Sequence, residues 1–167
     1  MARIGPLVGA GILMGAGMGG FVDGIVFHQI LQWHNMLSAQ QRPVTLEAAK
    51  VNMFWDGVFH AAVWVMTAVG LITLFRAGAR SDVMWSGRGF FGAWLLGWGL
   101  FNLIEGLIDH HLIGLHHVHE YAANPLPYDL AFLLSGVSLS AVGWWLIRSA
   151  RGPGEEIRLP REPGRAA

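Results

Sequence analysis

The chain has 167 residues, no net charge and no cysteine. Hydrophobic residues make up 53% of it and charged residues only 13%, against about 25% charged residues in an average soluble domain. This composition favours a one-domain integral membrane protein and argues against a nucleic-acid partner. The absence of cysteine excludes disulfides, thiolate metal ligands and a cysteine nucleophile.

Four segments are long and apolar enough to cross a bilayer, which takes about 20 residues per helix. They cover about residues 4–37, 46–75, 87–115 and 128–147, and Thr45 is placed to cap the second. The sequence therefore predicts an all-α, four-helix transmembrane bundle within residues 1–148, with the lipid bilayer as its main partner. Residues 149–167 are rich in proline, glycine and charge, so we expect a disordered cytoplasmic tail.

The distribution of basic residues predicts the orientation of the bundle. With four spans, nine of the 11 lysines and arginines fall on the side of the two termini, and only Arg42 and Lys50 fall on the other. Cytoplasmic loops carry the excess of basic residues. We therefore expect a multi-pass protein of the inner (cytoplasmic) membrane, with both termini cytoplasmic and the histidine-bearing loops on the outer side.

Each span carries an acidic residue at a similar depth: Asp23, Asp56, Glu105 and Asp129. Counted at 1.5 Å per residue from the cytoplasmic ends, all four lie roughly 27–30 Å along their helices. Acids at one level of a membrane repel each other, and protonation or bound cations relieve that repulsion. The spacing thus predicts an acid layer near the outer edge of the hydrocarbon.

Histidines accompany these acids in three spans, as DGIVFH at residues 23–28, DGVFH at 56–60 and EGLIDH at 105–110. Mixed histidine and carboxylate sets suit zinc, iron or copper, and such ligands projecting into a helical bundle are how di-iron proteins are built. The sequence therefore predicts a divalent metal site. Its predicted ligands are Asp23, His28, Asp56, His60, Glu105, Asp109 and His110.

Further polar residues near the same level are candidates for a second ligand shell or a second site. They are His34, His111, His116, His117 and Asp129. The sequence does not decide whether the histidines that follow the third span, His119 among them, bind metal or form a polar outer loop.

The first span raises a geometric difficulty. By the 3.6-residue period, Asp23 and His34 share a helical face, but His28 lies about 140° away from them. The helix cannot aim all three residues at one point unless it bends or several sites exist. A haem clamped between His28 and His60 is a less favoured use of the histidines, because the neighbouring acids oppose burial of the haem.

Three functional classes remain open at this point. The first is a metal-dependent oxidoreductase or hydrolase. The second is a metal-handling or assembly subunit, which implies other membrane subunits as partners. The third is a metal-free proton or ion relay. The sequence has no Walker loop, dinucleotide fingerprint or HExxH motif to narrow this choice.

Two segments, DGIVFHQILQWHNML and GWGLFNLIEGLIDHHLIGLHHVHE, resemble the hallmark segments of a bacterial family of predicted four-span membrane proteins of unknown function. The resemblance covers about residues 5–148. It implies an integral membrane protein and no established activity. One departure is Asn35, which follows His34 where the resemblance leads us to expect a second histidine.

Overall fold

The computed structural model describes residues 4–150, which are helical and contain no β-strand. Helix α1 (Gly5–Val22) continues into the π-helical segment η1 (Asp23–Ile30), and α3 (Gly87–Glu105) continues into η2 (Gly106–Leu112). The other elements are α2 (Leu46–Gly78) and α4 (Leu126–Ser149). Together they make four apolar spans, each long enough to cross a bilayer, so the expected all-α membrane fold is confirmed.

The helices begin where the sequence supplies capping groups. The Thr45 hydroxyl accepts a hydrogen bond from the Ala48 N–H at 3.2 Å, which confirms Thr45 as the N-cap of α2. Ser86 caps α3 in the same way through the Gly89 N–H at 3.0 Å. Apart from Ser149 and Ala150, which close α4, the expected disordered tail lies outside the described residues.

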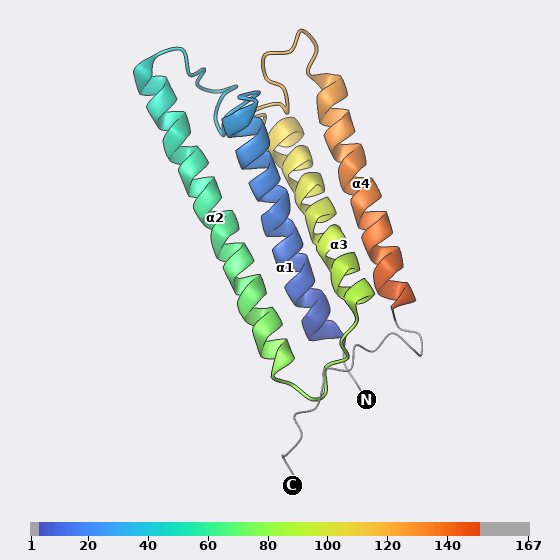
Figure 1. The fold of residues 1–167 in the computed structure, drawn as a ribbon. Helices are drawn as coiled ribbons and strands as arrows, with labels where there is room; N and C mark the ends of the chain where they lie inside the picture. The colour runs from blue at the N-terminus through green and yellow to red at the C-terminus, as the bar shows by residue number, and fades with distance from the viewer. Residues whose placement is uncertain (1–3, 151–167) are drawn as a thin grey trace.

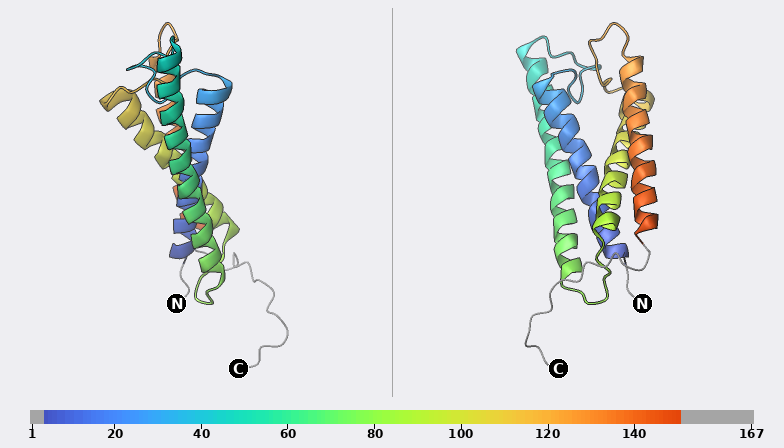
Figure 2. Two further views of the ribbon diagram at one scale, coloured as in Figure 1. Left: turned by 90° about the vertical axis from the view of Figure 1, so that its left-hand side faces the viewer. Right: turned by 45° about the vertical axis from the view of Figure 1, so that its right-hand side comes forward.

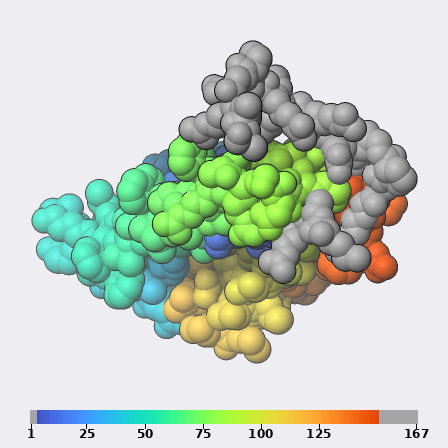
Figure 3. All heavy atoms as spheres, turned by 90° about the horizontal axis from the view of Figure 1, so that it is seen from below, coloured from blue at the N-terminus to red at the C-terminus, as the bar shows by residue number. Residues whose placement is uncertain are grey.

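The four spans form a row in the order α2, α1, α3, α4 (Figure 1). Helix α2 packs mainly on α1, α4 packs mainly on α3, and α1 and α3 form the central pair. The outer faces of α2 and α4 expose large apolar side chains, such as Trp64, Phe75 and Trp145. These exposed apolar faces fit contact with lipid. Viewed from the end that carries the loop between α2 and α3, the start of α2 projects sideways (Figure 3).

Helices α1 and α3 cross where both chains carry glycine. A Cβ atom on Gly15 would collide with the backbone of Trp94, and one on Gly97 would collide with the backbone of Ile12. Small residues permit this close approach of two membrane helices. Beyond the crossing the two helices diverge, as the left view of Figure 2 shows. The space between their diverging ends, where η1 and η2 lie, is the part of the fold that holds the candidate site.

We expect Gly15→Ala and Gly97→Ala each to destabilise the protein by about 1–3 kcal/mol, because the added methyl group would force the two backbones apart. Thermal unfolding in detergent would show this as a lower Tm. Gly57→Ala is the matched control, because nothing lies within 4 Å of a Cβ at that position. A Tm unchanged in all three variants would mean that the crossing does not depend on these glycines.

Candidate metal centre

The π-helical segments bring an acid and a histidine onto one helical face. Asp23 and His28 are five residues apart, and a π-helix pairs residues at that spacing. His28 Nε2 consequently lies 3.0 Å from Asp23 Oδ2. Glu105 and His110 have the same spacing at the junction of α3 and η2. The local change of helix type therefore removes the difficulty that a 3.6-residue period poses for His28.

After each π-helical segment the chain turns through a left-handed residue. Gln32 has φ of 52° and Gly114 has φ of 66°. A positive φ is uncommon for a residue other than glycine and is enriched at functional sites. These turns reverse the chain and bring His34 and His116 back between the diverging helices. Both side chains are fully buried there.

Six side chains meet in this space, and none is more than 6% exposed. They are Asp23, His28, His34, Glu105, His110 and His116, called the central cluster below. The rings of His34 and His116 stack with centroids 4.4 Å apart and planes 6° apart. The His28 ring lies 4.4 Å from that of His34, and the His110 ring lies 4.9 Å from that of His116. Four imidazoles and two carboxylates thus share one buried volume.

The cluster's ligand-type atoms face one another, and apart from the 3.0 Å pair of His28 Nε2 and Asp23 Oδ2 they have no close polar partner. These atoms are both oxygens of Asp23, Oε2 of Glu105, the Nε2 atoms of His28, His34 and His116, and both ring nitrogens of His110. Asp23 Oδ1 lies 3.7 Å from His34 Nε2, and Glu105 Oε1 lies 3.9 Å from His116 Nε2. With bonds of about 2.0–2.2 Å, two ligands of one ion lie at most about 4.4 Å apart. The spacing therefore fits metal ligands.

The opposite nitrogens of three rings are fixed from behind. Nδ1 of His28 lies 3.0 Å from Asp56 Oδ1, Nδ1 of His34 lies 2.8 Å from the Val118 carbonyl, and Nδ1 of His116 lies 3.2 Å from the Met36 carbonyl. An Nδ1–H that donates to an oxygen leaves the Nε2 lone pair free. Histidine ligands of metals are usually oriented in this way.

Asp56 is one of the groups that lie behind the rings, in what is called the outer shell below, and it does not face the cluster. Besides His28, it accepts hydrogen bonds from the Met36 N–H at 2.8 Å, the Asn35 amide at 2.8 Å and the Gln29 amide at 3.4 Å. Its two oxygens are therefore occupied. The structure places Asp56 where it orients His28 and ties α2 to the loop after η1.

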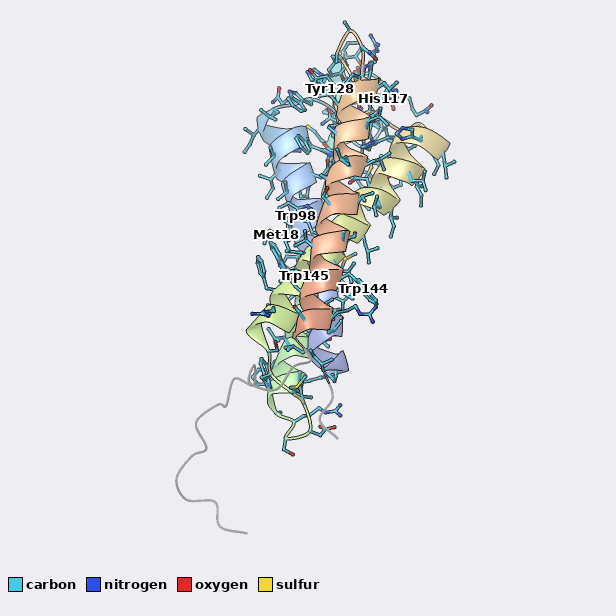
Figure 4. All side chains as sticks on the ribbon, turned by 90° about the vertical axis from the view of Figure 1, so that its right-hand side faces the viewer. Met18, Trp98, His117, Tyr128, Trp144 and Trp145 are labelled. Carbon is cyan, nitrogen blue, oxygen red and sulfur yellow. The ribbon has the colours of Figure 1, made fainter. Side chains whose placement is uncertain are left out.

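Asp129 plays the corresponding part on α4. Its Oδ1 accepts the Val118 N–H at 2.9 Å and lies 3.7 Å from His110 Nδ1. Its Oδ2 lies 2.7 Å from Nδ1 of His117, a ring near the end of the bundle (Figure 4). Asp129 thus links α4 to the loop after η2.

His116 lies beyond the end of the third span, and its protonation is constrained by its surroundings. Burial, together with the neighbouring rings of His34 and His110, holds the pKa of His116 well below its ordinary value. The imidazole is therefore neutral at neutral pH, which is the form that binds metal.

Besides Asp56, two more predicted ligands, His60 and Asp109, lie outside the central cluster. Nδ1 of His60 donates to the backbone carbonyl of Asp56 at 2.8 Å, and its ring packs against Gly24. Asp109 lines an apolar pocket of about 450 Å³ on the side of the bundle. Because His60 is turned to its own helix, the structure does not present His28 and His60 as a facing pair for haem.

The other outer histidines also have separate surroundings. His111 donates to the Gly106 carbonyl at 2.8 Å. The His119 ring stacks on Trp33 at 4.7 Å and lies 5.1 Å from Tyr128. Of the histidines expected in a second shell or second site, the structure brings only His34 and His116 into the cluster.

An internal sequence repeat accounts for the presence of His34 and His116 in the central cluster. In both halves an acid is followed by glycine, by a histidine five residues after the acid and by another histidine eleven residues after it. The equivalent pairs are Asp23 and Glu105, His28 and His110, Gln32 and Gly114, His34 and His116, Asn35 and His117, Met36 and Val118, and Asp56 and Asp129. The +11 spacing is the sequence signal that identifies His34 and His116.

The two halves, α1–η1–α2 and α3–η2–α4, exchange contacts as well as repeating them. His34 of the first half bonds to the carbonyl of Val118 in the second, and His116 of the second bonds to the carbonyl of Met36 in the first. The reciprocal contacts relate the halves by an approximate two-fold axis between the stacked rings. Parallel repeats of this kind occur in other membrane proteins.

A family model described as Predicted membrane protein (DUF2243) matches residues 10–150, which include every residue of the central cluster. The chain belongs to this family. No curated protein and no solved structure gives a significant match. The DUF2243 match and the four apolar spans together identify a multi-pass membrane protein.

We expect Asp56→Ala to lower the Tm clearly, because His28, Asn35 and the Met36 N–H would lose a buried acceptor and each such loss costs about 1–3 kcal/mol. Thermal unfolding in detergent measures the change. Asp82→Ala, which removes a carboxylate from an exposed ion pair with Arg80, is the control and should change the Tm little. Equal effects of the two substitutions would contradict the role assigned to Asp56.

Proposed function

We propose that this protein is an integral membrane metalloprotein whose central cluster holds divalent transition-metal ions. The supporting observation is the set of buried nitrogen and oxygen atoms that face one another, most of them without a hydrogen-bond partner. A buried polar atom without a partner costs about 1–3 kcal/mol, and several gathered in one place require a compensating group. A cation bound among them supplies that compensation.

The donor set favours particular metals. Imidazole nitrogen and carboxylate oxygen, without thiolate, suit iron, zinc or copper. Two histidines with one carboxylate and open positions are the ligand set of non-haem iron oxygenases, and the same residue types hold catalytic zinc. The ion would supply redox or Lewis-acid chemistry, so an oxidoreductase or hydrolase is the enzyme class that fits the site.

Burial favours a resident ion over one that is stored or passed on. Every side chain of the central cluster is at least nine-tenths buried, and three of its rings are fixed from behind by hydrogen bonds. A site that releases its ion needs exposed or mobile ligands. We therefore favour a cofactor site over a metal-handling site. From the distribution of basic residues, we place it near the outer face of the inner membrane.

Elemental analysis of detergent-purified protein tests this proposal. We expect wild type to contain a transition metal, His34→Ala to contain clearly less of it, and His60→Ala to keep it, because His34 lies in the central cluster and His60 does not. The His60 variant controls for removal of an intramembrane imidazole. A wild type that stays metal-free after anaerobic reconstitution with ferrous, zinc and copper ions would overturn the proposal.

Metal affinity should weaken as the pH falls from 7.5 to 5.5, because a proton on an imidazole removes a ligand. His116 itself contributes little to this loss, since its lowered pKa keeps it neutral under mildly acidic conditions. Competition with a chelator of known affinity at each pH measures the change. Identical affinities across this range would argue against histidine ligation.

A further inference from the structure

The two halves of the chain each bring one acid and two histidines close together. In the first, Asp23 lies 3.0 Å from His28 and 3.7 Å from His34 by their nearest side-chain atoms. In the second, the ligand atoms of Glu105, His110 and His116 all lie within 4.8 Å of one another. Each set therefore offers two imidazoles and one carboxylate from a single repeat.

From this duplication we infer that the centre binds two metal ions, one for each repeat. The first ion would be held by Asp23, His28 and His34. The second would be held by Glu105, His110 and His116. This inference rests on the proposed metal-binding function and adds the number of ions and the assignment of ligands to each.

The spread of the donor atoms argues against one shared ion. Six ligands of a single ion would all have to lie within about 4.4 Å of one another. Among the described residues, the compact groups of ligand atoms instead contain three residues each. One group is His28, His34 and His116, and the other is Glu105, His110 and His116. Asp23 is in neither group, but its Oδ2 lies 3.0 Å from His28 Nε2 and its Oδ1 lies 3.7 Å from His34 Nε2. Two adjacent ions, at the usual separation of about 3.5–4 Å in two-metal sites, fit such a distribution.

The distribution of buried carboxylates also favours two metal ions. Four buried carboxylates belong to the cluster and its outer shell: Asp23, Asp56, Glu105 and Asp129. Asp23 and Glu105 lie close enough to interact with each other across the centre. The described neighbours of these acids are imidazoles, side-chain amides and backbone groups, which carry no fixed positive charge. One divalent ion for each repeat would place a cation beside each of the two carboxylates that face the centre, Asp23 and Glu105, while Asp56 and Asp129 accept hydrogen bonds.

The test measures the metal content of wild type, two single variants and their double variant. Each protein is loaded with manganous ion in detergent and freed of excess ion, and its concentration is determined by amino-acid analysis. We expect two ions per chain in wild type, one in His28→Gln, one in His110→Gln and none in the double variant. His60→Gln and His111→Gln are matched controls outside the central cluster and should keep two. Far-UV circular dichroism and Tm establish that each variant is folded.

If His28→Gln or His110→Gln does not fold, Asp23→Asn or Glu105→Gln removes a ligand from the same repeat instead. Electron paramagnetic resonance gives a second readout. Wild type should show the spectrum of a coupled ion pair, and each single variant that of an isolated ion. One ion in wild type and none in either single variant would overturn the inference while leaving the proposed function intact. No ion in wild type under any loading condition would overturn the proposed function itself.

Discussion

The burial of four carboxylates at one end of a membrane bundle is the constraint around which this structure is arranged. An isolated charge in such an environment is costly, and several close together are costlier still. The protein meets this constraint in two layers. Asp56 and Asp129 accept hydrogen bonds from loop backbone groups and histidines, which stabilise the buried carboxylates. Asp23 and Glu105 point inward among four imidazoles, and this inner layer is where we propose that cations bind.

The geometry of the inner layer depends on departures from regular helix. A continuous α-helix would direct Asp23 and His28 to different faces, and the π-helical segment brings them together. The crossing at Gly15 and Gly97 then lets the helix ends diverge and opens the space that the rings fill. Backbone irregularity within a membrane is tolerated where it is covered by protein. Here the crossed loops of the two halves provide that cover.

The duplication gives the centre its approximate symmetry. Each half supplies an acid, two histidines and an outer carboxylate, and each half fixes a ring of the other through a backbone carbonyl. Neither half could complete the arrangement alone. The symmetry is broken at Asn35 and His117, which occupy equivalent positions against Asp56 and Asp129. An asymmetric outer shell is a means by which two otherwise equivalent ions could differ in affinity or reactivity.

Much of the fold could be predicted from hydropathy alone, because four long apolar segments admit few alternatives in a membrane. The acid layer could also be predicted, because the depth of a residue in a membrane helix follows from counting residues. The assignment of individual ligands could be predicted only in part. A regular 3.6-residue period favours His60, which is one α-helical turn from Asp56, and it separates His28 from Asp23. The helix type at residues 23–30 and the reversal at Gln32 are set by tertiary packing, so periodicity could not reveal them.

The most direct test is a crystal structure of the metal-loaded wild-type protein, with anomalous diffraction recorded at the absorption edge of the bound element. We expect two anomalous peaks in the central cluster. One should lie among Asp23, His28 and His34, and the other among Glu105, His110 and His116. A single peak on the approximate two-fold axis would contradict the assignment of one ion to each repeat. A cluster without any peak, in protein shown to contain metal, would contradict the site itself.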